Sequence, residues 1–260
     1  MDIKKPIITL ENVGKRFDQE NWAIADLNLN IYPAEIISLV GPSGCGKSTL
    51  LRLISGLTSL SSGTLHWEKS SQNQQFAFVF QDAALMPWAK VWHNVYLPLK
   101  LAGVSKKNAQ DKIQETLELV KLSQVAQSYP RQLSGGMKMR VSIARALVNN
   151  PEVLLMDEPF GALDDITRTQ LNDELLNLWS KKQWTIVFVT HNIYEAVYLS
   201  HRVVVMGTAP GRIVAEIAID EPYPRNPNFR GAIAYTEYYQ QVATALSQAI
   251  VDGNDNETHF

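Results

Sequence analysis

One short stretch near the N-terminus constrains this chain more than any other feature. It contains the complete pattern G-x-x-x-x-G-K-[ST]. The stretch follows the apolar run 36–40, typical of a buried strand, and precedes the apolar run 50–54, which suits a helix. In such a setting, backbone N–H groups wrap around phosphate oxygens at a helix N-terminus. The residues of this loop are Gly41, Pro42, Ser43, Gly44, Cys45, Gly46, Lys47, Ser48 and Thr49.

The side chains of this loop carry distinct expectations. Lys47 is predicted to reach the β- and γ-phosphates of a nucleotide, and the Ser48 hydroxyl is predicted to bind Mg²⁺. Cys45 is the only cysteine in the chain, which excludes an internal disulfide. We interpret Cys45 as a small loop residue. Its place beside Lys47 and a helix start is expected to lower its thiol pKa, so that a thiol reagent would block nucleotide binding.

The rest of the chain alternates between strand and helix patterns. Apolar, β-branched runs at 76–80, 153–156 and 185–189 predict buried strands, and helical spacing recurs over 106–122, 135–147 and 166–179. This alternation predicts an α/β fold with a parallel-rich sheet. A terminal helix is predicted over 235–251.

Bulk properties exclude some classes of function. The chain has 260 residues and a net charge of −2, which argues against a general nucleic-acid binder. No apolar run approaches the roughly 18–20 residues that are needed to cross a bilayer.

Polar side chains follow several of the predicted strands. Gln81, Asp157, Glu158 and His191 all follow such runs. Ligands of parallel α/β sheets bind at the carboxyl ends of the strands, so these side chains should share one surface with the loop. Asp157 is the expected second Mg²⁺ partner, directly or through water, and Glu158 is placed to orient or deprotonate an attacking water.

An ordered set of motifs resembles the ATP-binding cassette (ABC) family over roughly residues 7–217. Its signature motif is matched by Leu133, Ser134, Gly135, Gly136 and Met137. Phe17 matches the aromatic residue that stacks on adenine, and Gln81 matches the glutamine loop. Asp157 and Glu158 match the Walker B pair, Asp164 the dimer-contacting aspartate loop, and His191 the switch histidine.

The resemblance implies a phosphate-loop NTPase core with a parallel-rich sheet, an antiparallel β subdomain and a helical signature subdomain. Residues 1–220 would form the ATPase domain, with the helical subdomain at about 82–150, and residues 221–260 a C-terminal connector and helix. It also implies a head-to-tail homodimer, or a pair with a homologous cassette, in which residues 133–137 of one copy complete the ATP and Mg²⁺ site of the other. Gln81, Glu158 and His191 would then be catalytic, and Ser48, Gln81 and Asp157 would hold the metal.

Three positions depart from the family pattern. Met139 stands where glutamine is more common, Asn192 where aspartate is, and Ala34 where glycine is. None of these changes removes a predicted phosphate or Mg²⁺ ligand. Met139 is expected to change the hydrogen bonds of the signature helix, and Asn192 is expected to change the charge near His191.

The segment 82–95 is unusually rich in large apolar side chains for a loop. In the family this region forms the groove for a coupling helix of the membrane subunit, which would assign docking roles to Leu85, Trp88 and Trp92. The same side chains could instead pack inside the helical subdomain. The segment also resembles the nitrate, sulfonate and taurine importer group, as do residues 206–214 and 222–225.

This likeness implies the ATPase subunit of a bacterial importer. The subunit would lie on the cytoplasmic face of the inner membrane, held by integral membrane permease subunits, and an extracytoplasmic solute-binding protein would deliver cargo. A soluble cassette acting on DNA or ribosomes is the alternative, disfavoured by one cassette, one cysteine and near-neutral charge. A regulatory cassette with vestigial hydrolysis is disfavoured by Glu158 and His191.

Overall fold

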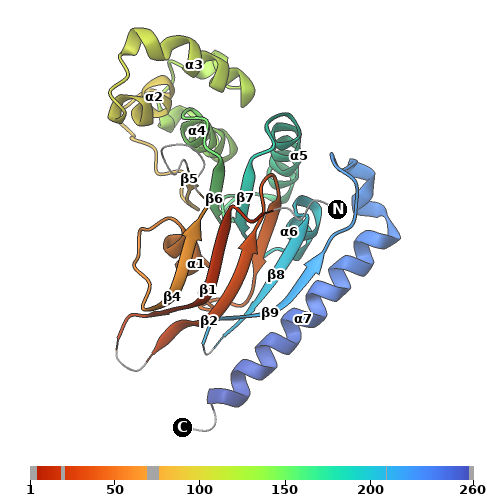
Figure 1. Ribbon diagram of the computed structural model, residues 1–260. Coiled ribbons are helices and arrows are strands. Elements are labelled where there is room, and N and C mark those ends of the chain that lie inside the picture. Colours follow the sequence, from red (N-terminus) through yellow and green to blue (C-terminus); the bar gives the residue numbers. More distant parts are fainter. Residues whose placement is uncertain (1–4, 19–20, 69–75, 209, 258–260) are drawn as a thin grey trace.

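The computed structural model describes residues 5–18, 21–68, 76–208 and 210–257 (Figure 1). Its centre is a six-stranded sheet in the order β5-β6-β7-β3-β8-β9. All neighbouring strands run parallel except the last pair, β8 and β9. The strands, in sheet order, are β5 (Phe76–Val79), β6 (Val153–Asp157), β7 (Thr185–Val189), β3 (Ile36–Val40), β8 (Arg202–Gly207) and β9 (Arg212–Ala218).

The central strands are buried on both faces, which explains why they read as continuous apolar runs. On one face, Ile37 and Leu39 of β3 pack with α1 (Lys47–Ile54) and the antiparallel sheet. On the other face, Ile36 and Val40 join a larger cluster with the remaining helices.

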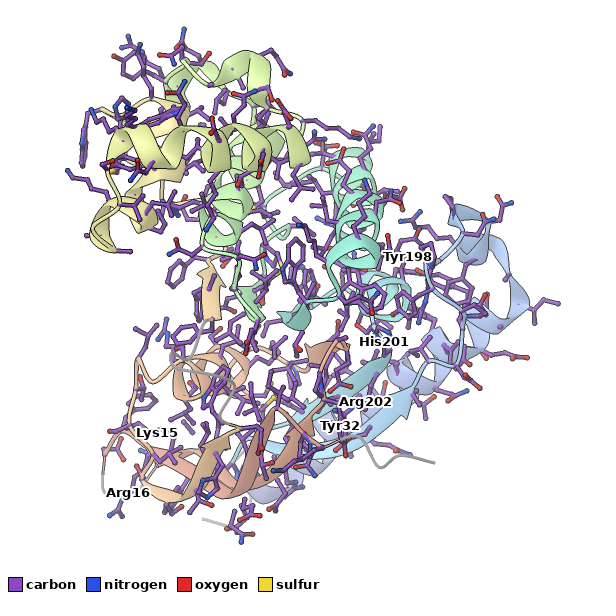
Figure 2. The ribbon with its side chains drawn as sticks, turned by 45° about the horizontal axis from the view of Figure 1, so that its top comes forward. Lys15, Arg16, Tyr32, Tyr198, His201 and Arg202 are labelled. Atoms are coloured by element: carbon purple, nitrogen blue, oxygen red, sulfur yellow. The ribbon has the colours of Figure 1, made fainter. Side chains whose placement is uncertain are left out.

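A second, antiparallel sheet of three strands has the order β2-β1-β4. Side chains of its inner face, such as Leu10 and Leu27, belong to the same cluster as α1. Arg202 of β8 joins the sheets: its guanidinium donates to the Asn30 carbonyl at 2.5 Å and pairs with Glu35 at 2.9 Å. Figure 2 shows Arg202 beside Tyr32. The strands are β1 (Ile8–Arg16), β2 (Trp22–Ile31) and β4 (Ser62–Trp67).

Apart from α1, the helices form two groups in Figure 1. One group makes a helical lobe at the end of the molecule that lies beyond β5. It consists of α2 (Val91–Leu101), α3 (Lys106–Leu119), α4 (Gly135–Leu147) and the short 3-10 helices η1 (Ser123–Val125) and η2 (Pro130–Gln132). The other group lies along the large sheet and consists of α5 (Asp165–Lys182), α6 (Ile193–Leu199), η3 (Pro227–Gly231) and α7 (Ile233–Glu257).

The structure confirms the predicted fold class, with its parallel-rich sheet, antiparallel sheet and helical lobe. Several elements are longer than their apolar patterns. The helix predicted over 166–179 extends to Lys182, and α7 continues to Glu257, because their last turns consist of polar residues that carry no apolar signal. Residues 258–260 lie outside the described residues, and the division at 82–150 and 221–260 stays a prediction. No helix in the described part of the chain has both the length and the apolarity to span a bilayer.

Candidate functional site

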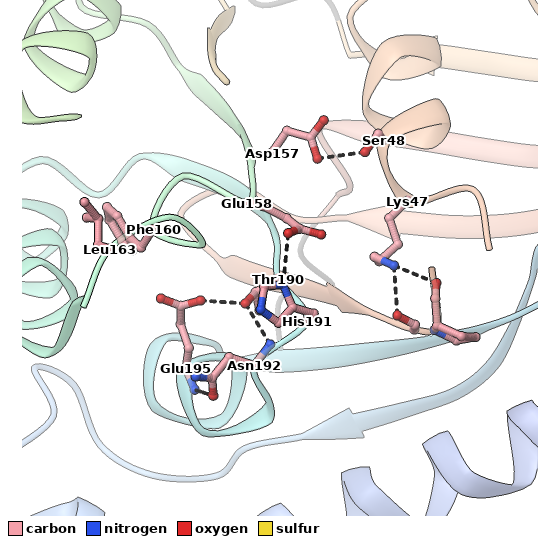
Figure 3. Close-up of polar contacts among 12 residues, drawn as sticks. Lys47, Ser48, Asp157, Glu158, Phe160, Leu163, Thr190, His191, Asn192 and Glu195 are labelled. Atoms are coloured by element: carbon pink, nitrogen blue, oxygen red, sulfur yellow. Dashed lines mark hydrogen bonds and ion pairs between the residues drawn. The ribbon is translucent and has the colours of Figure 1, made fainter. Parts of the chain in front are cut away.

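The predicted site residues converge at one edge of the large sheet. Strands β5, β6, β7 and β3 are consecutive and parallel, so the segments that follow them leave the sheet at the same edge. These segments carry Gln81, Glu158, His191 and the loop 41–49, and Asp157 is the last residue of β6. Figure 3 shows most of this constellation in close-up.

Two requirements fix the glycines of the loop. Gly44 and Gly46 have φ values of 83° and 94°, in the left-handed region that favours glycine. Gly46 also sits tightly against β2, because a Cβ there would lie 2.8 Å from Ile24 Cγ1. A Cβ on Gly41 would lie 2.6 Å from the Met206 carbonyl oxygen. The loop is therefore clamped between the antiparallel sheet and β8.

Lys47 opens α1 and lies under the loop. Its ammonium donates to the carbonyl oxygens of Gly41 and Pro42, at 2.8 Å each, and the side chain is almost fully buried (Figure 3). A buried ammonium whose contacts are neutral carbonyls leaves a net positive charge at the floor of the loop. Such a charge suits a polyanion.

Cys45 corrects one expectation. Its side chain is fully buried, and its sulfur lies 3.6 Å from the Lys47 ammonium. Burial raises the pKa of the Cys45 thiol, because lost hydration of the thiolate outweighs the attraction of Lys47. The expectation of a lowered pKa is therefore wrong. A thiol reagent needs a sulfur that is both accessible to solvent and ionised, and the Cys45 sulfur meets neither condition. The expected block of nucleotide binding by such a reagent therefore has no basis in this geometry.

The Ser48 hydroxyl donates to Asp157 Oδ1 at 2.9 Å (Figure 3). Burial raises the pKa of the Asp157 carboxyl despite this hydrogen bond. Among the described residues, no cluster of three or more His, Cys, Asp or Glu side chains could hold a metal. One hydroxyl and one carboxylate nevertheless fit Mg²⁺, which takes one or two protein oxygens when nucleotide phosphates supply others. The charge of a cation here would also favour the ionised carboxylate.

Glu158 follows directly in a constrained conformation. Its φ is 46°, unusual for a residue other than glycine, and its N–H donates to the Val189 carbonyl at 3.0 Å. This bond links Glu158 to the end of β7, close to His191. Glu158 Oε2 lies 2.9 Å from His191 Nδ1 (Figure 3). A Cβ on Gly161 would lie 3.5 Å from Glu158 Oε2 and 3.6 Å from Gln81 Nε2, so both side chains face the same space.

Phe17 lies next to the strands that support the loop. It directly follows β1, whose last residue, Arg16, pairs with Trp22 at the start of β2. The Phe17 ring is 67% exposed, and the Lys15 ammonium lies 5.2 Å from its centroid. Figure 2 places Lys15 and Arg16 at the outer edge of this sheet. An exposed ring at this edge is available to stack on a flat ligand.

The segment 133–137 is built differently from the other motifs. Ser134 caps α4, and its hydroxyl accepts the Met137 N–H at 3.3 Å. A Cβ on Gly136 would lie 2.7 Å from Thr167 Cγ2, so the segment packs on the start of α5. Asp164 caps α5 in turn, accepting the Thr167 N–H at 2.9 Å. Figure 1 places α4 in the helical lobe and α1 beside the antiparallel sheet. The segment 133–137 at the start of α4 and the loop 41–49 at the start of α1 therefore belong to different parts of the molecule.

Known proteins match this combination of fold and site. The profile of the ABC transporter family matches residues 24–161. An aliphatic sulfonates import ATP-binding protein of Bacillus cereus is 42% identical over 249 residues, covering 93% of this chain and 94% of that protein. The chain belongs to the ABC transporter family. An uncharacterized ABC transporter ATP-binding protein of Methanocaldococcus jannaschii is 41% identical, covering 96% of this chain and 95% of its own.

Solved ABC cassettes share the fold. The dimeric structure of a bacterial ABC transporter cassette aligns with a TM-score of 0.71 at 32% identity, covering 83% of this chain and 100% of that one. A second dimeric structure captures the same cassette in a post-hydrolysis state with ADP and phosphate, with a TM-score of 0.71 at 31% identity, covering 83% of this chain and 100% of that one. This chain is thus an ATPase of the ABC family, and a cassette of its fold dimerises.

The positions that depart from the ABC pattern have structural explanations. Met139 is 4% exposed and packs in the core, where a glutamine amide would need a partner. Asn192 caps α6 by accepting the Glu195 N–H at 3.2 Å, a role that asparagine and aspartate share. Ala34 has a φ of 58°, which explains why glycine is common at this turn.

The three predicted docking residues have different environments. Trp88 is 76% exposed. Leu85 and Trp92 are half-buried and pack against the core of the ABC cassette. The Arg145 guanidinium donates to the carbonyls of Ala83 and Ala84 at 2.8 Å each. These bonds hold the backbone just before Leu85.

Two further polar side chains shape the site, and neither was predicted from the sequence. Arg168 of α5 donates to the carbonyls of Leu163 at 2.8 Å and Phe160 at 3.3 Å, holding the segment between Glu158 and Asp164. Thr190 precedes His191 and donates to the buried Glu195. Their only sequence signal is proximity to a motif.

Proposed function

We propose that this chain is the ATP-hydrolysing subunit of a bacterial importer for a small solute of the sulfonate, nitrate or taurine type, or a related anion or metabolite. It would work on the cytoplasmic face of the inner membrane with integral membrane permease subunits, and a solute-binding protein would deliver cargo. The observation that carries the proposal is 42% identity over nearly the whole chain to proteins named as aliphatic sulfonates import ATP-binding proteins. The alternative of a soluble cassette acting on DNA or ribosomes finds no such support.

In the proposed reaction, a water attacks the γ-phosphorus of ATP, the bond to the β–γ bridging oxygen breaks, and ADP and phosphate leave. Lys47 binds the β- and γ-phosphates, and Phe17 stacks on the adenine ring. Glu158 orients the water and takes its proton. Bound Mg²⁺, held by Ser48 and Asp157 with Gln81, would neutralise charge on the β- and γ-oxygens.

His191 and Glu158 are proposed to act together. Their contact at 2.9 Å would orient the carboxylate toward the water while the imidazole senses the γ-phosphate. Gln81 would act in the same space, which is supported by the approach of both Gln81 Nε2 and Glu158 Oε2 to the position over Gly161.

We assign the remaining motif to contacts between copies. Residues 133–137 of a second copy would cover the γ-phosphate, with the N-terminus of α4 directed at the anion. Asp164 would contact the other copy next to them. This assignment is supported by the two dimeric structures of a cassette with the same fold.

The function is tested by transport. Removing this chain from its own host should abolish ATP-dependent uptake of a radiolabelled alkanesulfonate, and re-expression should restore it. Re-expression of the Lys47→Ala variant should not restore uptake, because the variant lacks the buried ammonium that binds the phosphates. Nitrate and taurine uptake measured in parallel would identify another cargo of the group. Unchanged uptake of all three solutes would refute the proposed cargo class.

The docking surface is proposed to be a groove of 420 Å³ in the helical lobe. Trp88, Met86 and Leu97 supply apolar lining, and Lys90, Lys100 and Lys106 supply positive charge. Burial, together with these lysines, lowers the pKa of His93 in the same groove. The groove therefore fits a permease helix with an apolar face and acidic flanks. Leu85 and Trp92 would support it from beneath.

Replacing Trp88 by glutamate should weaken assembly with the permease at least about tenfold, because the central aromatic anchor is lost. ATP affinity of the isolated subunit should not change. Co-purification with the permease and binding of a fluorescent ATP analogue measure the two effects. Leu101→Glu is the matched control, since Leu101 is 81% exposed in the same lobe but does not line the groove. Normal assembly of the Trp88 variant would exclude this groove.

A further inference from the structure

Three side chains form a closed arrangement around the backbone of His191. Thr190 Oγ1 donates to Glu195 Oε2 at 2.5 Å and accepts the Asn192 N–H at 3.0 Å. Asn192 Oδ1 accepts the Glu195 N–H at 3.2 Å. Thr190 and Glu195 are only 2% and 5% exposed, whereas the His191 ring points out of this arrangement toward Glu158 (Figure 3).

We propose that Glu195 is a positioning residue for His191, acting through the Thr190 hydroxyl. The inference rests on the proposed role of His191 in ATP hydrolysis. Because the hydroxyl is held on both sides, it restrains the backbone of residues 190–192. The His191 side chain, which leaves this backbone, is thereby aimed at Glu158.

A cap for α6 does not by itself require this carboxyl group. Asn192 already supplies the side-chain cap, and Glu195 contributes only its N–H to it. Placing a carboxyl group in the interior is unfavourable unless its oxygens are paired. Within the described residues, Glu195 Oε1 and Asn172 Oδ1 are buried without a protein hydrogen-bond partner, so the carboxyl group is only partly paired. Burial also raises the pKa of Glu195.

The arrangement extends to the helix that carries the aspartate loop. Glu195 lines the same pocket as Asn172 and Arg168, which both belong to α5. Arg168 in turn holds the carbonyls of Phe160 and Leu163, just before Asp164. Glu195 therefore stands between the histidine segment and the loop proposed to touch the second copy. A shift of that loop on dimerisation would change the position of the His191 side chain.

The test uses the full chain and steady-state ATP hydrolysis. Thr190→Val keeps the shape but removes the hydroxyl, and should lower kcat about tenfold or more with KM for ATP within about twofold, because misplacing a catalytic group acts on the chemical step. Thr190→Ser restores the hydroxyl and should recover most of kcat. In a His191→Ala background, Thr190→Val should cause no further loss, since both changes act through the same imidazole.

A second pair of variants repeats the test from the carboxyl side. Glu195→Ala should match the loss of Thr190→Val, whereas Glu195→Gln keeps an acceptor oxygen for Thr190 and should retain kcat within about threefold. Thermal melting separates these effects from unfolding. Wild-type kcat in folded Thr190→Val or Glu195→Ala would overturn the inference, as would an equal additional loss in the His191→Ala background. A fully active His191→Ala enzyme would instead overturn the proposed role of His191, and the inference with it.

Discussion

Replacing Glu158 by glutamine is expected to abolish ATP turnover while leaving ATP binding intact. The amide keeps the size of the side chain and a contact for His191, but it cannot take a proton from water. Loss of a general base typically costs about 10²–10⁴-fold in rate. Because bound ATP then persists, the closed dimer should accumulate. Phosphate release measures the first effect, and size-exclusion chromatography with saturating MgATP measures the second.

The design of this experiment separates chemistry from charge. Glu237→Gln makes the same change on α7, where Glu237 is exposed, and should leave both turnover and oligomeric state unaltered. Brisk hydrolysis by the Glu158 variant would exclude Glu158 as the base. A Glu158→Gln protein that stays monomeric when saturated with MgATP would contradict the assignment of residues 133–137 to a second copy.

The convergence of the site residues could be predicted because the sequence shows where the buried strands end. Each of β3, β5, β6 and β7 is an apolar run that stops at a polar motif. Parallel strands bring such stops to one edge, so Ser48, Asp157 and His191 could be grouped before any geometry was known. Their roles as ligands and catalysts stay predictions.

The errors and omissions have a common cause, which is that burial cannot be read from neighbours in sequence. Cys45 sits beside a lysine, which predicts a lowered pKa, but its sulfur is fully buried and the pKa is raised. Glu195 reads as an ordinary polar residue of a helix, yet it is interior and holds Thr190. Leu85 and Trp88 look alike in sequence, but only Trp88 is largely exposed. Such contrasts depend on packing between distant segments.

Lys47→Ala should have a comparably large effect, but on a different step. Removing the ammonium takes away a charge-assisted contact to the phosphates, in a buried setting where such contacts are strong. We expect ATP affinity or kcat/KM to fall about 10²-fold or more. The change also leaves the carbonyls of Gly41 and Pro42 without their donor, so stability should drop by about 1–3 kcal/mol.

The stability loss must not be mistaken for the loss of binding, and a second variant separates them. Lys47→Met keeps the apolar stem that fills the space under the loop, while it removes the charge. If the charge is what binds the phosphates, Lys47→Met and Lys47→Ala should lose similar ATP affinity although Lys47→Met melts at the higher temperature. Lys112→Ala, which removes an exposed lysine of α3, should bind ATP normally. ATP affinity of Lys47→Met within about twofold of the unchanged protein would mean that the loop backbone, rather than the buried ammonium, supplies the binding energy.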